Sequence, residues 1–352
     1  MRLLYMENGR EAKKALQLAR QKVASAINAK PKEIYFTSCG SESDNLALKG
    51  VAYKNKEKGN HIITTKIEHP AILHTCETLQ RQGFDVTYLN VDENGVISLT
   101  ELENAINYKT ILISTMFANN EIGTIEPIEK VGKIAKTHGV LFHTDSVQAI
   151  GNVKIDVKKL NVDLLSMSAH KFYGPKGVGA LYVKEGVEFE RIQDGGHQER
   201  NKRSGTENVA GIVGMAEAIK ISYENFEKYN KKLTDLREYY FSQVQEKIPN
   251  VKINGDRKLR LPGNASVSFA NVQSEEILFK LDEKGICASG GSACSTGSQK
   301  PSHVLLAIGL NSEMAKGTIR VTFGLENQKE DVDYLVDNLA KIVENLRKQN
   351  LE

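Results

Sequence analysis

The His170–Lys171 pair lies between two apolar stretches, and a lysine in that position can act as a nucleophile. A short apolar run at 162–167 is followed by small polar residues, the pair, a Gly/Pro turn and a second apolar run at 179–183. A lysine held among apolar neighbours and beside a second cation has a lowered pKa, and its neutral amine can form a Schiff base. The alternative is an ordinary surface loop, so the interpretation depends on which other residues gather around Lys171.

Asp145 ends another apolar run, where an unpaired carboxylate is costly, so we expect a cationic partner for it. A protonated pyridine nitrogen would serve, and Gln148, one helical turn later, could bond a ring hydroxyl. Ser168 and His170 supply hydrogen-bond donors for a phosphate beside Lys171. A phosphate site, a carboxylate for a ring nitrogen and a Schiff-base lysine together indicate pyridoxal 5′-phosphate (PLP).

A metal site is the rival interpretation of the same residues. His143, Asp145 and His170 are possible ligands, but such a site would leave Lys171 without a role. The cysteines lack zinc-like pairing and are too sparse for a disulfide framework, so we expect reduced thiols at Cys39, Cys76, Cys287 and Cys294.

Polar residues also follow other predicted strands. Gly40 and Ser41 come where a helix begins, so that backbone N–H groups and the helix dipole could favour a phosphate, although a simple N-cap explains them too. His69 opens the next helix and could stack on an aromatic ligand. An amide of the 119–121 turn could face the same ligand, and the loop at 203–206 suits a phosphate. Ordinary helix starts and surface turns are the alternatives for each.

Two residues of the C-terminal third could serve catalysis. Cys294 lies in the Gly/Ser-rich stretch 288–298, which cannot pack well, so we expect a mobile arm whose thiol attacks at one place and delivers at another. Arg320 is a cation in an otherwise apolar strand and suits bidentate capture of a carboxylate. A structural salt bridge is the alternative for Arg320.

The elements that position these residues alternate along the first two thirds of the chain. Near-continuous apolar runs separated by helical periodicity predict an α/β fold, with a mainly parallel seven-stranded sheet and helices on both faces. Ligands bind at the carboxyl ends of such strands, where these polar residues collect. We expect strands at 34–38, 61–65, 84–89, 110–116, 140–145, 162–167 and 179–183, and helices at 11–29, 43–58, 70–82 and 128–138.

The remaining part predicts a smaller α+β domain. After a helix at 208–229, we expect strands at 251–254, 265–269 and 318–323, and helices at 231–248, 274–284, 301–310 and 330–348. The predicted domains are therefore a large PLP-binding domain at 1–228 and a small C-terminal domain at 229–352. The small domain would carry the mobile cysteine loop at about 285–300.

The composition excludes several classes of function. The 352 residues carry a net charge of +3 without long basic runs, which argues against a nucleic-acid surface. No apolar stretch approaches the roughly 20 residues of a membrane span, and the first residues lack the apolar core of a signal peptide. We therefore expect a cytoplasmic protein with no membrane partner.

From about Gly9 to its end, the chain resembles the NifS/IscS-type cysteine desulfurases of the class V aminotransferase family. These are PLP enzymes of fold type I, the aspartate-aminotransferase-like fold. The motifs that carry the resemblance stand in family order: Phe-Thr-Ser-x-x-Ser-Glu-Ser-Asp-Asn at 36–45, Glu-His-Pro at 68–70, Asn-Asn-Glu-Ile-Gly at 119–123, His-Thr-Asp-Ser-Val-Gln at 143–148, Ser-Ala-His-Lys-Phe-Tyr-Gly-Pro-Lys-Gly at 168–177, Arg-Ser-Gly-Thr at 203–206 and Gly-Ser-Ala-Cys at 291–294.

The resemblance implies a homodimeric sulfurtransferase that converts L-cysteine to L-alanine and leaves the sulfur on Cys294 as a persulfide. It implies that Lys171 holds PLP covalently and moves the Cα proton, and that His69 stacks on the pyridine and assists proton transfer. Asn120 and Arg320 would bind the substrate carboxylate. The implied cofactor contacts are Gly40, Ser41, His69, Asn120, Asp145, Gln148, Ser168, His170, Lys171 and, from the partner subunit, Thr206.

The implied partner is a sulfur-acceptor protein, either an iron–sulfur scaffold or a tRNA-thiolation enzyme. No resident metal is expected, beyond a transient contact of Cys294 with an iron–sulfur cluster.

Two departures from the family pattern stand out: Cys39 replaces a common glycine, and the opening segment of the type Tyr-Leu-Asp-Asn-Ala-Ala-Thr-Thr is missing from this sequence. Since that segment lines the active site in the family, we expect its absence to expose the cofactor or weaken the fold. A catalytically impaired PLP-binding homologue and a selenocysteine lyase are the alternatives.

Overall fold

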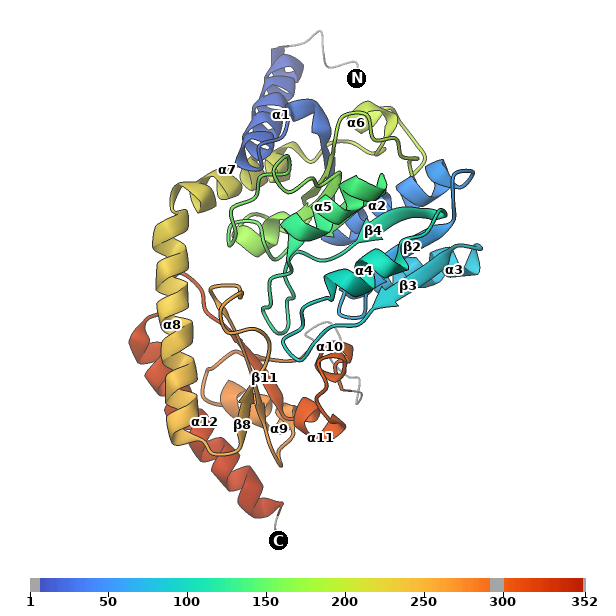
Figure 1. The fold of residues 1–352 in the computed structure, drawn as a ribbon. Coiled ribbons are helices and arrows are strands. Elements are labelled where there is room, and N and C mark those ends of the chain that lie inside the picture. The colour runs from blue at the N-terminus through green and yellow to red at the C-terminus, as the bar shows by residue number, and fades with distance from the viewer. Residues whose placement is uncertain (1–6, 292–300, 351–352) are drawn as a thin grey trace. The chain divides into compact units, whose positions relative to one another are not determined.

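The structure is a computed structural model that describes residues 7–291 and 301–350, and the chain divides into two compact units (Figure 1). The large unit consists of the residues up to Leu89 together with Ile97–Phe117 and Glu126–Phe226. The small unit consists of Asn90–Val96, Ala118–Ile125 and the residues from Glu227 onward. The domain division at 228/229 stays a prediction, and the compact units assign two short internal segments to the C-terminal part.

Backbone pairing explains why one of these internal segments belongs to the small unit. Thr124 forms an isolated antiparallel bridge with Arg260, and the Ile125 N–H donates to the Leu259 carbonyl at 2.9 Å. Such pairing joins residues far apart in sequence, so no local pattern in the sequence could reveal it.

The large unit is built on a seven-stranded sheet with the order β1-β7-β6-β5-β4-β2-β3. Neighbouring strands from β3 through β6 are parallel, and β7 runs antiparallel to both β6 and β1. The mainly parallel sheet predicted from the apolar runs is therefore confirmed. The strands are β1 Ile34–Thr37, β2 His61–Thr65, β3 Asp85–Leu89, β4 Thr110–Ser114, β5 Leu141–Asp145, β6 Leu164–Ser168 and β7 Gly179–Val183.

Helices cover both faces of this sheet. Helix α2 contacts α3, and α4 contacts α5. Because α2 and α3 lead toward the β3 edge while α4 and α5 lead back, right-handed crossovers place the two pairs on opposite faces. The helices of the large unit include α1 Glu7–Ala26, α2 Gly40–Asn55, α3 Pro70–Arg81, α4 Leu99–Ala105, α5 Ile128–His138 and α7 Val209–Glu224, with the shorter α6 Gln198–Asn201 and the 3-10 turns η2 Pro31–Glu33 and η3 Ala169–Phe172.

Buried side chains of α2 and α3 fill the space against the sheet. Leu46, Leu48 and Val51 of α2 join Ile72 and Leu79 of α3 in one apolar cluster with strand residues. At roughly 25 cal/mol for each Å² of apolar surface removed from water, burial of such side chains dominates the stability of the unit. The cluster fixes the start of α2 over the ends of the central strands.

The small unit has a four-stranded antiparallel sheet with the order β10-β11-β9-β8. The expected helix at 208–229 is interrupted, because α7 ends at Glu224 and α8 begins at Phe226. None of the helices in the described parts of the chain is long and apolar enough to cross a membrane. The elements are α8 Phe226–Lys247, β8 Val251–Ile253, β9 Asn264–Phe269, α9 Ser274–Asp282, β10 Ser289–Gly290, α10 His303–Ala307, α11 Ser312–Lys316, β11 Thr318–Thr322 and α12 Lys329–Gln349.

Candidate active site

The ends of β1 and β6 meet at one edge of the large sheet. Thr37, the last residue of β1, and Ser168, the last of β6, both pair with Gly179 of β7. Two turns that the sequence singled out follow directly: residues 38–41, which open α2, and the 3-10 turn Ala169–Phe172, which carries Lys171. Strand pairing therefore brings the predicted phosphate-binding and lysine-bearing turns side by side.

A glycine is required at position 40 because neighbouring side chains leave no room for a Cβ atom. A Cβ atom at Gly40 would lie 2.6 Å from Val147 Cγ2 and 3.4 Å from Ser168 Cβ. Cys39, the N-cap residue of α2, makes no side-chain cap hydrogen bond, and Ser41 is exposed. The first amide groups of an α-helix have no partner within the helix, so the start of α2 can accept an anion.

Asp145 is the buried carboxylate of the site. It is 7% exposed and accepts a hydrogen bond from the Val147 N–H at 2.9 Å. Burial raises the pKa of Asp145 to about 6, partly offset by that hydrogen bond and by the positive charge of Lys171. A cation placed against this carboxylate would favour its ionised form.

Behind Asp145 lies a polar network that the sequence analysis missed. His143 is fully buried, with Nδ1 2.9 Å from Ser114 Oγ and Nε2 2.9 Å from Ser166 Oγ, and burial lowers its pKa to about 3. Its Nε2 lies 3.8 Å from Oδ1 of Asp44, which is 1% exposed. Burial, and next the negative charge of Asp145, raise the pKa of Asp44 well above its usual value.

Glu68 is a second buried acid that the sequence analysis missed. Its Oε1 accepts hydrogen bonds from Thr65 Oγ1 and the Met116 N–H, each at 2.8 Å, and burial raises its pKa. The burial of Asp44 could have been predicted from the sequence, because this acid lies on the same helical face as Leu48 and Val51. For Glu68 the sequence gives a weaker indication of burial, since the acid directly follows the apolar residue Ile67.

The described residues do not support the metal site considered as a rival. Across 7–291 and 301–350, no group of three or more His, Cys, Asp or Glu side chains could hold a metal ion. His143 hydrogen-bonds serine hydroxyls through both ring nitrogens, so it is not available as a ligand for a metal shared with His170.

Lys171 is exposed, so the expectation of apolar surroundings for it is wrong. The tight 3-10 turn sends Ala169 and Phe172 into the core and turns Lys171 and His170 outward. Partial burial, and then the positive charges of Lys171 and Lys176, lower the pKa of His170. His170 is thus a neutral imidazole at pH 7 rather than a second cation, and its Nδ1 lies 3.1 Å from Ser168 Oγ.

The other candidates in the large unit take different positions. His69 is the half-buried N-cap of α3, and its Nδ1 accepts a hydrogen bond from the Ala71 N–H at 3.1 Å. Gln148 is half-buried in the turn after β5. Thr206 is exposed and lines a cavity of about 180 Å³ together with Ser38 and Arg203.

The two candidates for binding a substrate carboxylate lie together in the small unit. Arg320 Nη1 donates to the Asn120 carbonyl at 2.8 Å, and Asn264 Nδ2 donates to the same carbonyl at 3.1 Å. Glu121, 2% exposed, accepts a hydrogen bond from Ser302 Oγ at 2.5 Å. Cys294 lies outside the described residues.

The fold, a mainly parallel seven-stranded sheet with helices on both faces, is that of the fold-type I enzymes. The chain belongs to the aminotransferase class-V family, whose model matches residues 5–335. It is 55% identical over 342 residues to "Cysteine desulfurase IscS" of Clostridium botulinum, which covers 97% of this chain and 86% of that protein.

Solved structures agree with this family. A "NIFS-LIKE PROTEIN" superposes with a TM-score of 0.90 at 39% identity, over 97% of this chain and 94% of that one. "SspA in complex with cysteine" superposes with a TM-score of 0.79, also at 39% identity, over 89% of this chain and 88% of that one.

Proposed function

We propose that this protein is a PLP-dependent cysteine desulfurase that converts L-cysteine to L-alanine and transfers the sulfur to Cys294. The observation that carries the proposal is the convergence, at one sheet edge, of the open start of α2 at Gly40, the buried carboxylate of Asp145 and the turn bearing Lys171. The similarity to proteins named cysteine desulfurase gives the substrate.

The residues present fit PLP. The glycine cradle at Gly40, with Ser41, Ser168 and His170 around it, offers donors for a phosphate. Asp145, whose pKa burial raises to about 6, is mostly ionised at pH 7 and would keep a pyridine nitrogen protonated. When bound, PLP supplies an electron sink for charge that develops at the substrate Cα.

The protein's own groups then have distinct tasks. Lys171 would hold the cofactor covalently and carry the proton that leaves and returns at Cα, with His69 stacked on the ring and Gln148 at its oxygen. Asn120 and Arg320 would hold the substrate carboxylate. The Cys294 thiolate would form a bond to the substrate sulfur while the Cβ–S bond breaks, leaving alanine and a persulfide.

We also propose a homodimer in which Thr206 contributes to the partner's phosphate site. An apolar groove of about 740 Å³ between α1 and α7, with Leu18 50% and Val213 41% exposed, supports a protein interface on the large unit. The proposed large domain binds PLP, and the small domain carries the cysteine arm. The persulfide would pass, in the cytoplasm, to an iron–sulfur scaffold or a tRNA-thiolation enzyme.

Two variants test the function. Lys171→Ala should lower sulfide release from L-cysteine by at least about 1,000-fold and abolish the visible cofactor band, because the covalent attachment is lost. Cys294→Ala should keep the band and lose sulfide release. Cys287→Ala, which removes an exposed thiol seven positions earlier in the chain, should behave as wild type.

Each alternative predicts a different result. A catalytically impaired homologue would release no sulfide even as the wild type, and a lyase acting only on selenocysteine would turn over selenocysteine but not L-cysteine. Release of sulfide by Lys171→Ala or Cys294→Ala at the wild-type rate would contradict the proposal.

A further inference from the structure

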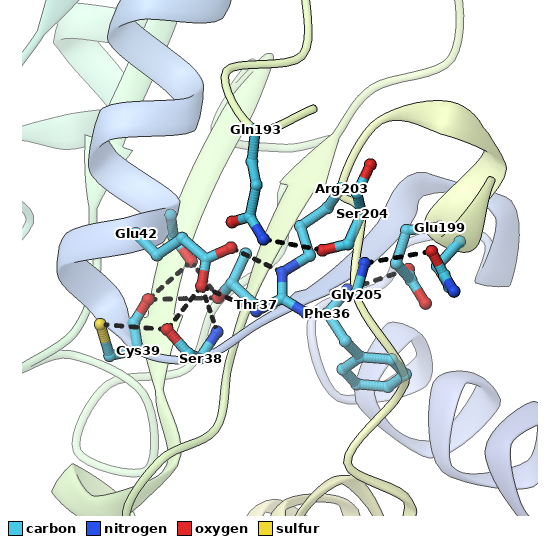
Figure 2. A network of polar contacts seen from close by, with 12 residues as sticks. Phe36, Thr37, Ser38, Cys39, Glu42, Gln193, Glu199, Arg203, Ser204 and Gly205 are labelled. Atoms are coloured by element: carbon cyan, nitrogen blue, oxygen red, sulfur yellow. Dashed lines mark hydrogen bonds and ion pairs between the residues drawn. The ribbon is translucent and has the colours of Figure 1, made fainter. Parts of the chain in front are cut away.

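Glu42 places a negative charge at the start of α2, where the proposed phosphate would bind. Its carboxylate accepts hydrogen bonds from the Ser38 N–H at 2.7 Å and from the Ser38 hydroxyl (Figure 2). On its other side, Arg203 donates to it through Nε at 2.6 Å and Nη2 at 3.1 Å. Glu42 thus shapes the 38–41 turn and forms a bidentate ion pair across to the 203–206 loop.

The pair is largely shielded from solvent. The Arg203 and Glu42 side chains are 19% and 17% exposed. Burial alone would raise the pKa of Glu42, but the hydrogen bonds from Arg203 and Ser38 outweigh it and lower that pKa. The hydrogen bond to Glu42 likewise raises the pKa of Arg203. Both groups are therefore charged at neutral pH.

The 203–206 loop is also held on its far side, as Figure 2 shows. Gln193 Nε2 donates to the Ser204 carbonyl at 3.1 Å, and the Gly205 N–H donates to Gln198 Oε1 at 3.0 Å. The Ser204 hydroxyl donates to the Gly196 carbonyl at 2.9 Å. The ion pair therefore links this anchored loop to the 38–41 turn, beside the cavity that Thr206 lines.

We propose that Glu42 and Arg203 are positioning residues for the phosphate of PLP, an inference that rests on the proposed function. Glu42 holds the 38–41 turn in shape through Ser38. Arg203 cancels the negative charge that Glu42 would otherwise present to a phosphate dianion, and it fixes the loop to the turn. An unpaired carboxylate at this place repels the phosphate.

A comparison of PLP with pyridoxal, which lacks the phosphate, distinguishes this role from a purely structural one. Pyridoxal carries the same aldehyde and ring but no phosphate, so loss of charge cancellation should weaken PLP and leave pyridoxal unchanged. A general loss of structure should weaken both ligands alike. The ratio of the two dissociation constants therefore measures the electrostatic part.

The experiment is an absorbance titration of apoprotein, prepared from purified holoenzyme, with PLP and with pyridoxal. Arg203→Gln should raise the dissociation constant of PLP about tenfold and that of pyridoxal less than about twofold. The double variant Glu42→Gln/Arg203→Gln should return to within about threefold of wild type, because no charge is left unpaired. Arg191→Gln, which breaks the exposed Arg191–Asp194 pair, is the matched control and should change neither constant.

Equal weakening of both ligands by Arg203→Gln, or no recovery in the double variant, would overturn the inference. If Arg203→Gln does not fold, Arg203→Lys carries the test: it keeps the charge, so a tenfold fall in the PLP-to-pyridoxal preference would contradict the charge-cancelling role. A wild-type protein that binds no PLP would overturn the proposed function itself, and this inference with it.

Discussion

Two acids on the first turns of α2 have opposite environments. Glu42 faces the 203–206 loop, where Arg203 and Ser38 lower its pKa. Asp44 faces the sheet beside His143, where burial and Asp145 raise its pKa. The difference shows that one helix can hold two acids whose pKa values are shifted in opposite directions, according to whether a cation is within reach.

The position of Asp145 between these extremes has a functional consequence. Its pKa of about 6 reflects burial partly balanced by Lys171, while burial and the charge of Asp145 raise the pKa of Asp44. Two neighbouring buried carboxylates rarely ionise together, and the raised pKa of Asp44 leaves Asp145 as the acid that ionises first. That charge is then available for a ring nitrogen.

The largest expected effect is a loss of activity when Asp145 is replaced. Asp145→Asn should lower kcat for L-cysteine by about 100-fold or more, because a neutral amide does not hold a ring nitrogen protonated. Asp44→Asn is the matched control and should stay within about threefold of wild type, since asparagine keeps the size of the side chain and its capacity for hydrogen bonds. Steady-state alanine production measures both, and similar losses in the two variants would contradict the assignment of the charge to Asp145.

An intermediate effect is expected at the start of α2. Gly40→Ala would push a methyl group to 2.6 Å from Val147 Cγ2, so the 38–41 turn must shift. We expect a cost of about 1–3 kcal/mol in the free energy of unfolding and weaker PLP binding. Urea denaturation and a PLP titration measure these quantities. Wild-type values in both would show that the turn has room for a methyl group at position 40.

The smallest effect concerns pH and stability. Because the folded pKa of Glu42 is lowered, its ion pair contributes stability above the unfolded pKa and loses it as pH falls through the folded value. Glu42→Gln should therefore cost about 1–2 kcal/mol at pH 7, and the difference from wild type should shrink below about pH 4.5. Because the folded pKa of Asp44 is raised, its contribution to stability should instead decrease as pH rises. Urea denaturation across pH tests this, and a pH-independent difference would count against the ion pair.

Much of the fold could be predicted from the sequence because the strands are buried on both faces. The apolar runs gave the bounds of β2 and β7 as they stand, and the polar ends of β5 and β6 identified Asp145 and Ser168. The short helix α4 went unpredicted because seven residues show little periodicity, although Ser98 and Glu101 at its start have the spacing of a helix cap.

Other features of the site depend on three-dimensional neighbours. The exposure of Lys171 follows from a 3-10 turn, which apolar periodicity does not detect. The role of Glu42 depends on Arg203, which is far away in the sequence. The acids Asp44 and Glu68 lie within motifs that the sequence analysis noted, but nothing local shows that both are buried close enough to Asp145 to feel its charge.

The central claim is that this chain binds PLP and uses it to take sulfur from L-cysteine. Its most direct test is the visible absorption spectrum of the purified protein before and after addition of L-cysteine, with alanine assayed in the same sample. We predict a cofactor band that shifts on addition while alanine accumulates. A protein without such a band, or a band that L-cysteine leaves unchanged with no alanine formed, would contradict the claim.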